Sequence, residues 1–354
     1  MAIEIRPVPI PERAGAEGWE LFARVTAVSS AIDVAGYGRA EFAFPAEEDL
    51  PHWHDPEQIK HLFAALDGDR VVGRLAAWAP TEAPDNANAF VQVLPEEQGR
   101  GIGSLLHQRL LELAAEQRYV KMVTWAVSPD APGERITAPT GFGSIPRDNR
   151  EVRFLLDRGW RVEQVERASR FALPGDPELL ARLRADAEAR AAGYRLHTWA
   201  GFTPERLRDG MAELMERMTT DAPSAGLEEP AETWDAARIV DNDTRLDDSP
   251  ATMLATAVEH VATGRLAGMT RLRVPDDPAR PAWQWDTIVR REDRGHRLGM
   301  LLKIANLDAL AERFPGRPSV ITWNAEENRH MLDVNEAIGF EPIGYEGAWR
   351  RDLA

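Results

Sequence analysis

A glycine-dense stretch from Gln98 to Gly103 contains the residues best suited to chemistry in this sequence. It reads Gln-Gly-Arg-Gly-Ile-Gly, follows the apolar run Val91 to Leu94 and precedes a run with helical spacing of apolar residues. Glycine permits a tight turn and a close approach of the backbone to a ligand, and the unpaired N–H groups at a helix start carry a partial positive charge. The stretch therefore predicts a strand, an anion-binding loop and a helix, with a diphosphate as the ligand.

A second stretch repeats this pattern later in the chain. The strand-like run Asp286 to Val289 leads through a charged turn into Arg294-Gly-His-Arg-Leu-Gly299 and a further apolar helix. Gln98 and Arg294 lie 196 residues apart (294 − 98), and the equivalent strand residues Trp125 and Trp323 lie 198 apart (323 − 125). Such self-similarity indicates a duplicated chain. The later pair Gly159-Trp160 and Gly339-Phe340 lies only 180 apart (339 − 159), so copy one carries about 18 extra residues (198 − 180) near positions 129–147.

Neither loop has the Gly-x-Gly-x-x-Gly pattern of dinucleotide-binding proteins or the Lys-Ser/Thr ending of a P-loop. Both resemble the coenzyme A loop of the GNAT acetyltransferase superfamily, which reads Gln/Arg-x-x-Gly-x-Gly/Ala; Gln98, Gly101 and Gly103 occupy its defining places.

The order of the expected elements resembles the GNAT order twice, and the tandem arrangement is similar to that of mycothiol synthase, whose second half is the catalytic one. The resemblance implies acetyl-CoA as co-substrate, no metal, and direct transfer of an acetyl group to an amine of a small molecule or peptide. The positions it assigns to coenzyme A binding are Val93, Gln98, Gly99, Arg100, Gly101, Ile102, Gly103 and Ser104 in copy one, and Val289, Arg294, Gly295, His296, Arg297, Leu298, Gly299, Asn324 and Asn328 in copy two.

Two parallel strands splay apart in GNAT enzymes to admit the thioester, here expected after Val93 and Trp125 in copy one, and after Val289 and Trp323 in copy two. An amide N–H beyond the bulged strand polarises the thioester carbonyl, and a proton acceptor is needed for the amine. The family often places a tyrosine on the late helix as general acid. Copy two has Asn335 at that position, and copy one has Leu155, which cannot donate a proton.

Polar residues around the expected thiol position distinguish the two copies. We predict Asp286 as the general base of copy two, with Asn324 and Asn335 as catalytic polar groups, whereas the copy-one equivalents Phe90 and Ala126 offer none. Copy two is therefore the expected chemical site. The alternative, motivated by the missing tyrosine in both copies, is a non-catalytic acyl-CoA-binding sensor or interaction protein. Candidate acceptor-binding residues are Asp221, Glu228, Glu229, Trp283 and Trp285.

Composition limits the other classes of function. The 354 residues include no cysteine, which excludes disulfides, thiolate zinc sites and an acyl-cysteine mechanism. The net charge of −16 disfavours nucleic acid and anionic membranes as partners. Because the sequence has no long apolar run and starts with a charged strand, we expect a cytoplasmic enzyme; the oligomeric state is not readable.

The length and the pattern of elements together predict an α/β fold of the α+β mixed-sheet type. We expect two tandem GNAT-like domains, each a twisted mixed β-sheet flanked by helices. The predicted boundaries are 1–175 for the first domain, 176–192 for a linking helix and 193–354 for the second domain.

Overall fold

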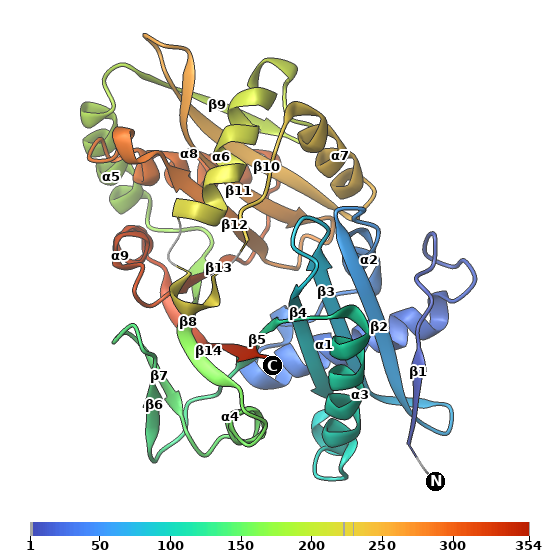
Figure 1. Ribbon diagram of the computed structural model, residues 1–354. Coiled ribbons are helices and arrows are strands. Elements are labelled where there is room, and N and C mark those ends of the chain that lie inside the picture. The colour runs from blue at the N-terminus through green and yellow to red at the C-terminus, as the bar shows by residue number, and fades with distance from the viewer. Residues whose placement is uncertain (1–2, 222–223, 229, 354) are drawn as a thin grey trace. The chain divides into compact units, whose positions relative to one another are not determined.

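A computed structural model describes residues 3–221, 224–228 and 230–353 of the chain (Figure 1). The chain forms two compact units. Unit 1 contains Met1–Glu166, Ser224–Pro230 and Gly344–Ala354, and unit 2 contains Arg167–Pro223 and Ala231–Ile343. These units differ from the predicted contiguous domains, because two short segments of the second half of the chain belong to unit 1.

Unit 1 is built on a mixed sheet with the strand order β1-β2-β3-β4-β5-β14-β8. The pairs β1–β2, β2–β3, β3–β4 and β5–β14 are antiparallel, and β4 and β5 run parallel. The strands are β1 (Glu4–Pro7), β2 (Gln58–Asp67), β3 (Arg70–Pro80), β4 (Asn86–Val93) and β5 (Lys121–Val127), with parts of β8 (Arg161–Ala172) and β14 (Glu341–Asp352). The helices are α1 (Trp19–Tyr37), α2 (Ala46–Trp53), α3 (Ile102–Gln117) and α4 (Arg150–Leu156), with short 3-10 turns at Ala40–Phe42, Pro95–Glu97 and Ala225–Leu227.

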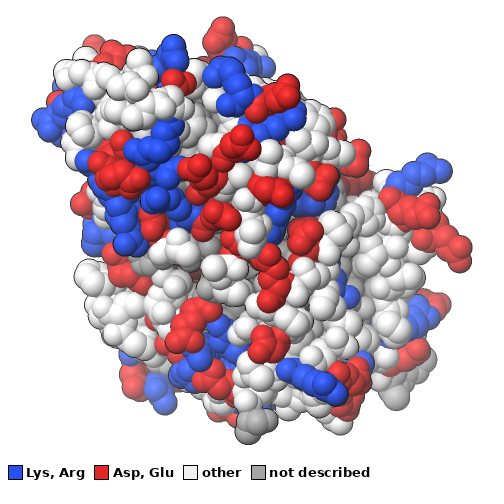
Figure 2. All heavy atoms as spheres, turned by 45° about the horizontal axis from the view of Figure 1, so that its top comes forward, with Lys and Arg blue, Asp and Glu red and all other residues white. Residues whose placement is uncertain are grey.

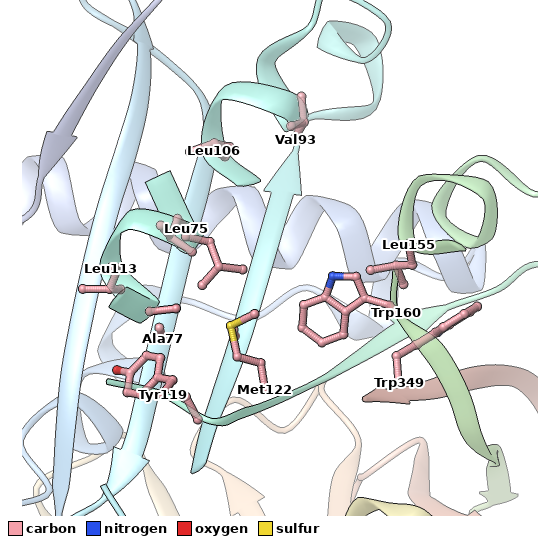
Figure 3. Packing of buried hydrophobic residues seen from close by; sticks show 14 of the residues in the cluster. Leu75, Ala77, Val93, Leu106, Leu113, Tyr119, Met122, Leu155, Trp160 and Trp349 are labelled. Atoms are coloured by element: carbon pink, nitrogen blue, oxygen red, sulfur yellow. The ribbon is translucent and has the colours of Figure 1, made fainter. Parts of the chain in front are cut away.

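Helices cover both faces of this sheet, because its strands place apolar side chains alternately on the two sides. On one face, Leu106, Leu110 and Leu113 of α3 pack with Leu75 and Met122 of the sheet (Figure 3). On the other face, α1 and α2 pack against a second group of buried strand residues. The central strands therefore lie between two apolar layers. The gap between β4 and β5 connects the two faces of the sheet.

The predicted elements of copy one are largely confirmed. The predicted strand before the first glycine loop is β4, and the predicted helix after the loop is α3, which begins at Ile102. Part of the predicted insertion at 129–147 pairs as a hairpin of β6 (Arg135–Thr137) and β7 (Ser144–Pro146).

Unit 2 repeats the arrangement, with the strand order β8-β13-β12-β11-β10-β9 and a parallel pair formed by β12 and β13. Its core joins α8 to the inner strands, and α5 packs on α8. The strands are β9 (Tyr194–Ala200), β10 (Ala251–His260), β11 (Arg265–Pro275), β12 (Ala282–Val289) and β13 (Ser319–Ala325). The helices are α5 (Pro177–Arg190), α6 (Arg208–Asp221), α7 (Ala236–Asp247), α8 (Leu298–Arg313) and α9 (Arg329–Ile338), with 3-10 turns at Glu205–Leu207 and Arg291–Asp293.

The parallel strands of each unit separate after a short paired stretch. In unit 1 the described pairing of β4 with β5 ends at Asn88 and Val123, and in unit 2 that of β12 with β13 ends at Trp283 and Ile321. Both gaps therefore open several residues earlier than predicted. The expected bulge is present in β12, where the register with β11 shifts between Thr270 and Leu272, whereas β4 keeps a regular register with β3.

Acidic and basic side chains are interspersed on the face of the molecule in Figure 2, so the net negative charge does not gather there into one large patch. No helix among the described residues is long and apolar enough to cross a lipid bilayer.

Candidate active site

The first glycine loop has the backbone geometry expected of an anion cradle. Gly99 and Gly101 have φ values of 87° and 84°, a left-handed region that favours glycine, and α3 begins directly afterwards at Ile102. The Gln98 side chain donates from Nε2 to the carbonyl oxygen of Val93 at 3.1 Å, which ties the loop to the end of β4. A Cβ atom at Gly103 would lie 3.0 Å from the Phe154 ring, so a larger side chain there would push against that ring.

A cavity of about 660 Å³ opens beside this loop within unit 1. It is lined by most of the predicted loop residues and, from the other face of the sheet, by Ser29, Ile32 and Asp33 of α1. The gap between β4 and β5 therefore connects the helix start that can hold a diphosphate to the α1 side of the sheet. The predicted coenzyme A residues that line the cavity are Val93, Gln98, Gly99, Gly101, Ile102, Gly103 and Ser104.

Two arginines near the loop have different roles. Arg100, which the sequence assigned to coenzyme A, forms ion pairs with Asp67 at 2.7 Å and with Glu97, so its guanidinium is used within the protein. Arg150, at the start of α4, also lines the cavity, and its side chain has no ion-pair or hydrogen-bond partner among the described residues. Arg150 is thus the better placed cation for a phosphate group.

Asp33 and Glu346 place two carboxylates in the cavity wall on the α1 side. Burial raises the pKa of Asp33 to about 7, and the negative charge of Glu346 acts in the same direction, whereas the positive charge of Arg74 opposes it. Glu346 accepts a hydrogen bond from the Tyr37 hydroxyl. A carboxyl group that titrates near neutral pH is well suited to accept a proton from a reacting amine.

Stacked aromatic rings form another part of the cavity wall. The ring of Phe90 stacks on Trp78 with centroids 5.0 Å apart and on Trp125 at 6.4 Å. Phe90 is the copy-one equivalent of Asp286, so the position that offers a carboxylate in copy two supplies an apolar surface here.

His107 also lines the cavity, but its environment keeps it neutral. Burial lowers the pKa of His107 to about 4, and the nearby Arg351 acts in the same direction. Its Nε2 atom accepts from Arg351 Nη1 at 3.1 Å and from Trp160 Nε1 at 3.5 Å. With that lone pair engaged, His107 is a poorer proton acceptor than Asp33.

The second glycine loop repeats the backbone geometry but has more protein contacts. Arg294 donates from Nε to the carbonyl oxygen of Val289 at 3.3 Å, and Gly295 has φ 88°. Arg297 adopts φ 55° directly before Leu298, and its guanidinium pairs with Asp186 of α5. His296 lies with Nδ1 3.2 Å from the carbonyl oxygen of Arg190, also on α5. A Cβ atom at Gly295 or at Gly299 would meet no atom within 4 Å.

Asn324 and Asn335, the two predicted catalytic amides, are in direct contact. The Asn335 Nδ2 group donates to Asn324 Oδ1 at 2.7 Å, and Asn335 is almost fully buried. Asn328 accepts from the backbone N–H of Met331 and so caps α9. Asp286 lies at the β12 bulge and accepts from Arg271 Nε at 2.7 Å, which makes it one half of an ion pair.

The predicted acceptor residues do not form one group. Asp221 lies 3.0 Å from Arg291 and 4.0 Å from Arg294 of the second loop, whereas Glu228 belongs to unit 1 and pairs with Arg350 at 2.8 Å. The Trp283 ring stacks on Trp323 with centroids 5.7 Å apart. The remaining two candidates are Trp285, which is 43 % exposed, and Glu229, which lies outside the described residues.

Sequence reasoning missed the charged residues Asp33, Arg74 and Glu346 on the α1 side of the first cavity, and Arg150 beside the glycine loop. Asp33 and Glu346 are more than 300 positions apart, so no local pattern joins them. Arg74 was the one detectable signal, because it interrupts the otherwise apolar run Val71 to Ala79. A lone charge inside a buried strand requires a partner or a ligand.

Comparisons with known proteins agree with this geometry. The model of the acetyltransferase (GNAT) family matches residues 31–135, which include the first loop and much of the cavity wall. No curated protein matches the sequence. A tandem GNAT protein from the clavulanic acid biosynthesis pathway is 26 % identical, with a TM-score of 0.70 over 99 % of this chain and 98 % of that one.

Two more distant structures share the fold. A GCN5-related N-acetyltransferase from Sphaerobacter thermophilus is 15 % identical, with a TM-score of 0.63 over 99 % of this chain and 95 % of that one. Saccharomyces cerevisiae N-myristoyltransferase is 9 % identical, with a TM-score of 0.54 over 99 % and 79 % of the two chains. Residues 31–135 therefore match the GNAT family, and the whole chain is similar in fold to a tandem GNAT protein, as the two glycine loops predicted. The reaction of this family is acyl-CoA-dependent acetyl transfer.

Proposed function

We propose that the protein is an N-acetyltransferase in which unit 1 binds acetyl-CoA and transfers the acetyl group to an amine of a small molecule or peptide. One observation carries this proposal: a single cavity is lined by the first glycine loop and by the carboxylate of Asp33. The proposal departs from the expectation that copy two does the chemistry. It draws support from the contacts of Arg297 and His296 with α5, which already occupy side chains of the second loop.

The residues of the cavity fit acetyl-CoA. The backbone of residues 99–103 and the start of α3 suit a diphosphate, and Arg150 supplies an unpaired cation nearby. When bound, acetyl-CoA supplies the acetyl group as a thioester, and its thiolate leaves without a strong acid because the parent pKa is about 8.5. The absence of the family's usual tyrosine, replaced by Leu155, is therefore compatible with transfer.

Asp33 takes the role of proton acceptor in this proposal. The incoming ammonium group must lose a proton before its nitrogen can attack, and the carboxylate form of Asp33 accepts that proton. As the C–N bond forms, the C–S bond breaks and the amine loses a second proton, which balances the protonation of the leaving thiolate. The aromatic wall of Trp78, Phe90 and Trp125 keeps bulk water from part of the cavity, which strengthens these interactions.

The test is release of free thiol from acetyl-CoA in the presence of a panel of amines, followed by mass analysis of the acetylated product. Amine-dependent thiol release, lost in Asp33→Asn, is the expected result. A second candidate function is non-catalytic acyl-CoA binding, favoured by the absence of the tyrosine from both copies. Calorimetric binding of acetyl-CoA without turnover on any amine would replace the first proposal by the second.

A further inference from the structure

Arg74 presents a buried cation with unused hydrogen-bond donors in the wall of the first cavity. It lies on β3, is 7 % exposed, and donates from Nε to the Oε1 atom of its cross-strand partner Gln92 at 2.5 Å. A guanidinium group carries five N–H donors. The four on Nη1 and Nη2 have no hydrogen-bond partner among the described residues, and both Arg74 and Gln92 line the cavity.

A buried guanidinium without a counter-ion is costly, so the surroundings of Arg74 are informative. Among the residues that the structure describes, it has no carboxylate within ion-pair distance. Asp33 and Asp49 are near enough to act on its pKa, but Asp49 already accepts from Thr26 at 3.2 Å and from Trp53 at 3.0 Å. The planar pair of Nη groups is the arrangement that binds a carboxylate through two parallel hydrogen bonds.

The cavity therefore holds charges of both signs on the α1 side of the sheet. Asp33 and Glu346 are suited to an ammonium group, and Arg74 is suited to a carboxylate. A diamine would leave the guanidinium unsatisfied, and a simple monoamine would do the same. A ligand that carries one amine and one carboxylate satisfies all three residues.

We propose that the acetyl acceptor is an amino acid, whose carboxylate binds Arg74 and whose amine faces Asp33. This inference rests on the proposed function and names the acceptor class of the same cavity. In the reaction the amine nitrogen forms the bond to the acetyl carbon while the C–S bond breaks, and the carboxylate of the acceptor stays unchanged on Arg74. Acetylation removes the positive charge of the acceptor amine, so the product is no longer attracted to Asp33 and Glu346. Only the interaction of its carboxylate with Arg74 remains.

The experiment compares each common amino acid with its carboxamide and its decarboxylated amine, using kcat/KM with acetyl-CoA. The preferred amino acid is expected to exceed its carboxamide by at least about tenfold, because a charge-assisted pair of hydrogen bonds is lost. Equal or faster transfer to the carboxamide and the decarboxylated amine would overturn the inference and leave the proposed function standing. Lack of transfer to every amine defeats the proposed function instead.

A binding measurement tests the carboxylate site at Arg74 even if no amine is acetylated. Calorimetry in the presence of coenzyme A compares the N-acetyl amino acids with their N-acetyl amides. Binding of the acids alone supports a carboxylate site at Arg74 even without turnover, and equal binding of both series contradicts it.

Two variants connect the preference to Arg74. In Arg74→Gln the ratio of kcat/KM for the amino acid to that for its carboxamide should fall to about one, because the two donors facing the carboxylate are removed. Arg74→Lys keeps the charge without the planar pair and should retain part of the preference. The ratio is the readout, since a purely structural role of Arg74 lowers both rates alike. An unchanged ratio in folded Arg74→Gln rules out the assignment.

Discussion

Gln98 and Arg294 make the same contact in the two units. Gln98 donates to the carbonyl oxygen of Val93 at 3.1 Å, and Arg294 donates to that of Val289 at 3.3 Å, so each residue ties its glycine loop to the end of the preceding strand. The donors and the acceptors are both 196 residues apart (294 − 98 and 289 − 93). The duplication therefore extends to individual hydrogen bonds, and the differences between the units lie in the side chains around this shared frame.

The first prediction concerns the loop that binds the diphosphate. Gly101→Val with Gly103→Val should lower the affinity for coenzyme A at least about tenfold, because residue 101 has a left-handed backbone and a side chain at 103 meets the Phe154 ring. Calorimetric titration measures the affinity and stoichiometry. The matched control is Gly299→Val in the second loop, where an added side chain meets open space. Unchanged affinity and stoichiometry in the double variant would argue against the first loop as the binding site.

The second prediction concerns the pH dependence of turnover. Because only the carboxylate form of Asp33 accepts a proton, kcat/KM should rise with pH through about 7. Asp33→Asn should lower kcat by about a hundredfold and remove this limb of the profile. Glu20→Gln, an exposed substitution on the same helix, is the control and should leave the profile intact. A pH limb that persists in Asp33→Asn would assign the proton acceptor elsewhere.

The third prediction concerns the effect of the Asp33 carboxyl group on stability. The pKa of Asp33 in the folded chain is raised to about 7 from an ordinary value of 3.8. Between these values the native state binds more protons than the unfolded state, so the contribution of Asp33 to stability is lost as the pH rises through about 7. Asp33→Asn should therefore gain thermal stability relative to the wild type between pH 5 and pH 8. A difference in melting temperature that is the same at both pH values would contradict the raised pKa.

The interior of both units followed from the sequence because it depends on periodic patterns. Leu106, Leu110 and Leu113 recur with helical spacing, and the strands around them alternate or run continuously apolar, so loop, helix and sheet could be placed. The site could not be completed in this way. Asp33 and Glu346 meet only because Gly344–Ala354 returns to unit 1, and no local pattern encodes that return.

The role of Asp286 could not be decided from the sequence either. A carboxylate at the end of a strand fits a general base, but the same residue type also balances a neighbouring arginine. The choice depends on Arg271, which lies opposite on the next strand, and on the β12 bulge that turns Asp286 toward it. Such a pairing depends on register, which hydrophobic periodicity fixes only where one face of a strand is apolar.

The fourth prediction tests this ion pair. Asp286→Asn leaves the buried Arg271 guanidinium without its counter-charge, so the free energy of unfolding should fall by about 1–3 kcal/mol. Chemical denaturation measures this loss, and the pH profile of turnover should keep its limb near 7. If instead turnover collapses while stability is unchanged, the general base lies in unit 2, as the sequence alone predicted.

The fifth prediction concerns the strand that completes unit 1. Trp349 on β14 is fully buried in the same apolar core as Met122 and Trp160, and β14 pairs with β5 so that Trp349 lies opposite Thr124 (Figure 3). Trp349→Ala should therefore lower the free energy of unfolding by about 3–5 kcal/mol, because it removes buried apolar surface and leaves a cavity. Chemical denaturation followed by circular dichroism gives the value. The matched control is Trp285→Ala, since that ring is 43 % exposed and its removal leaves no comparable cavity. If the two substitutions cost the same, β14 does not hold the first core together, and the placement of Glu346 in the cavity wall loses its support.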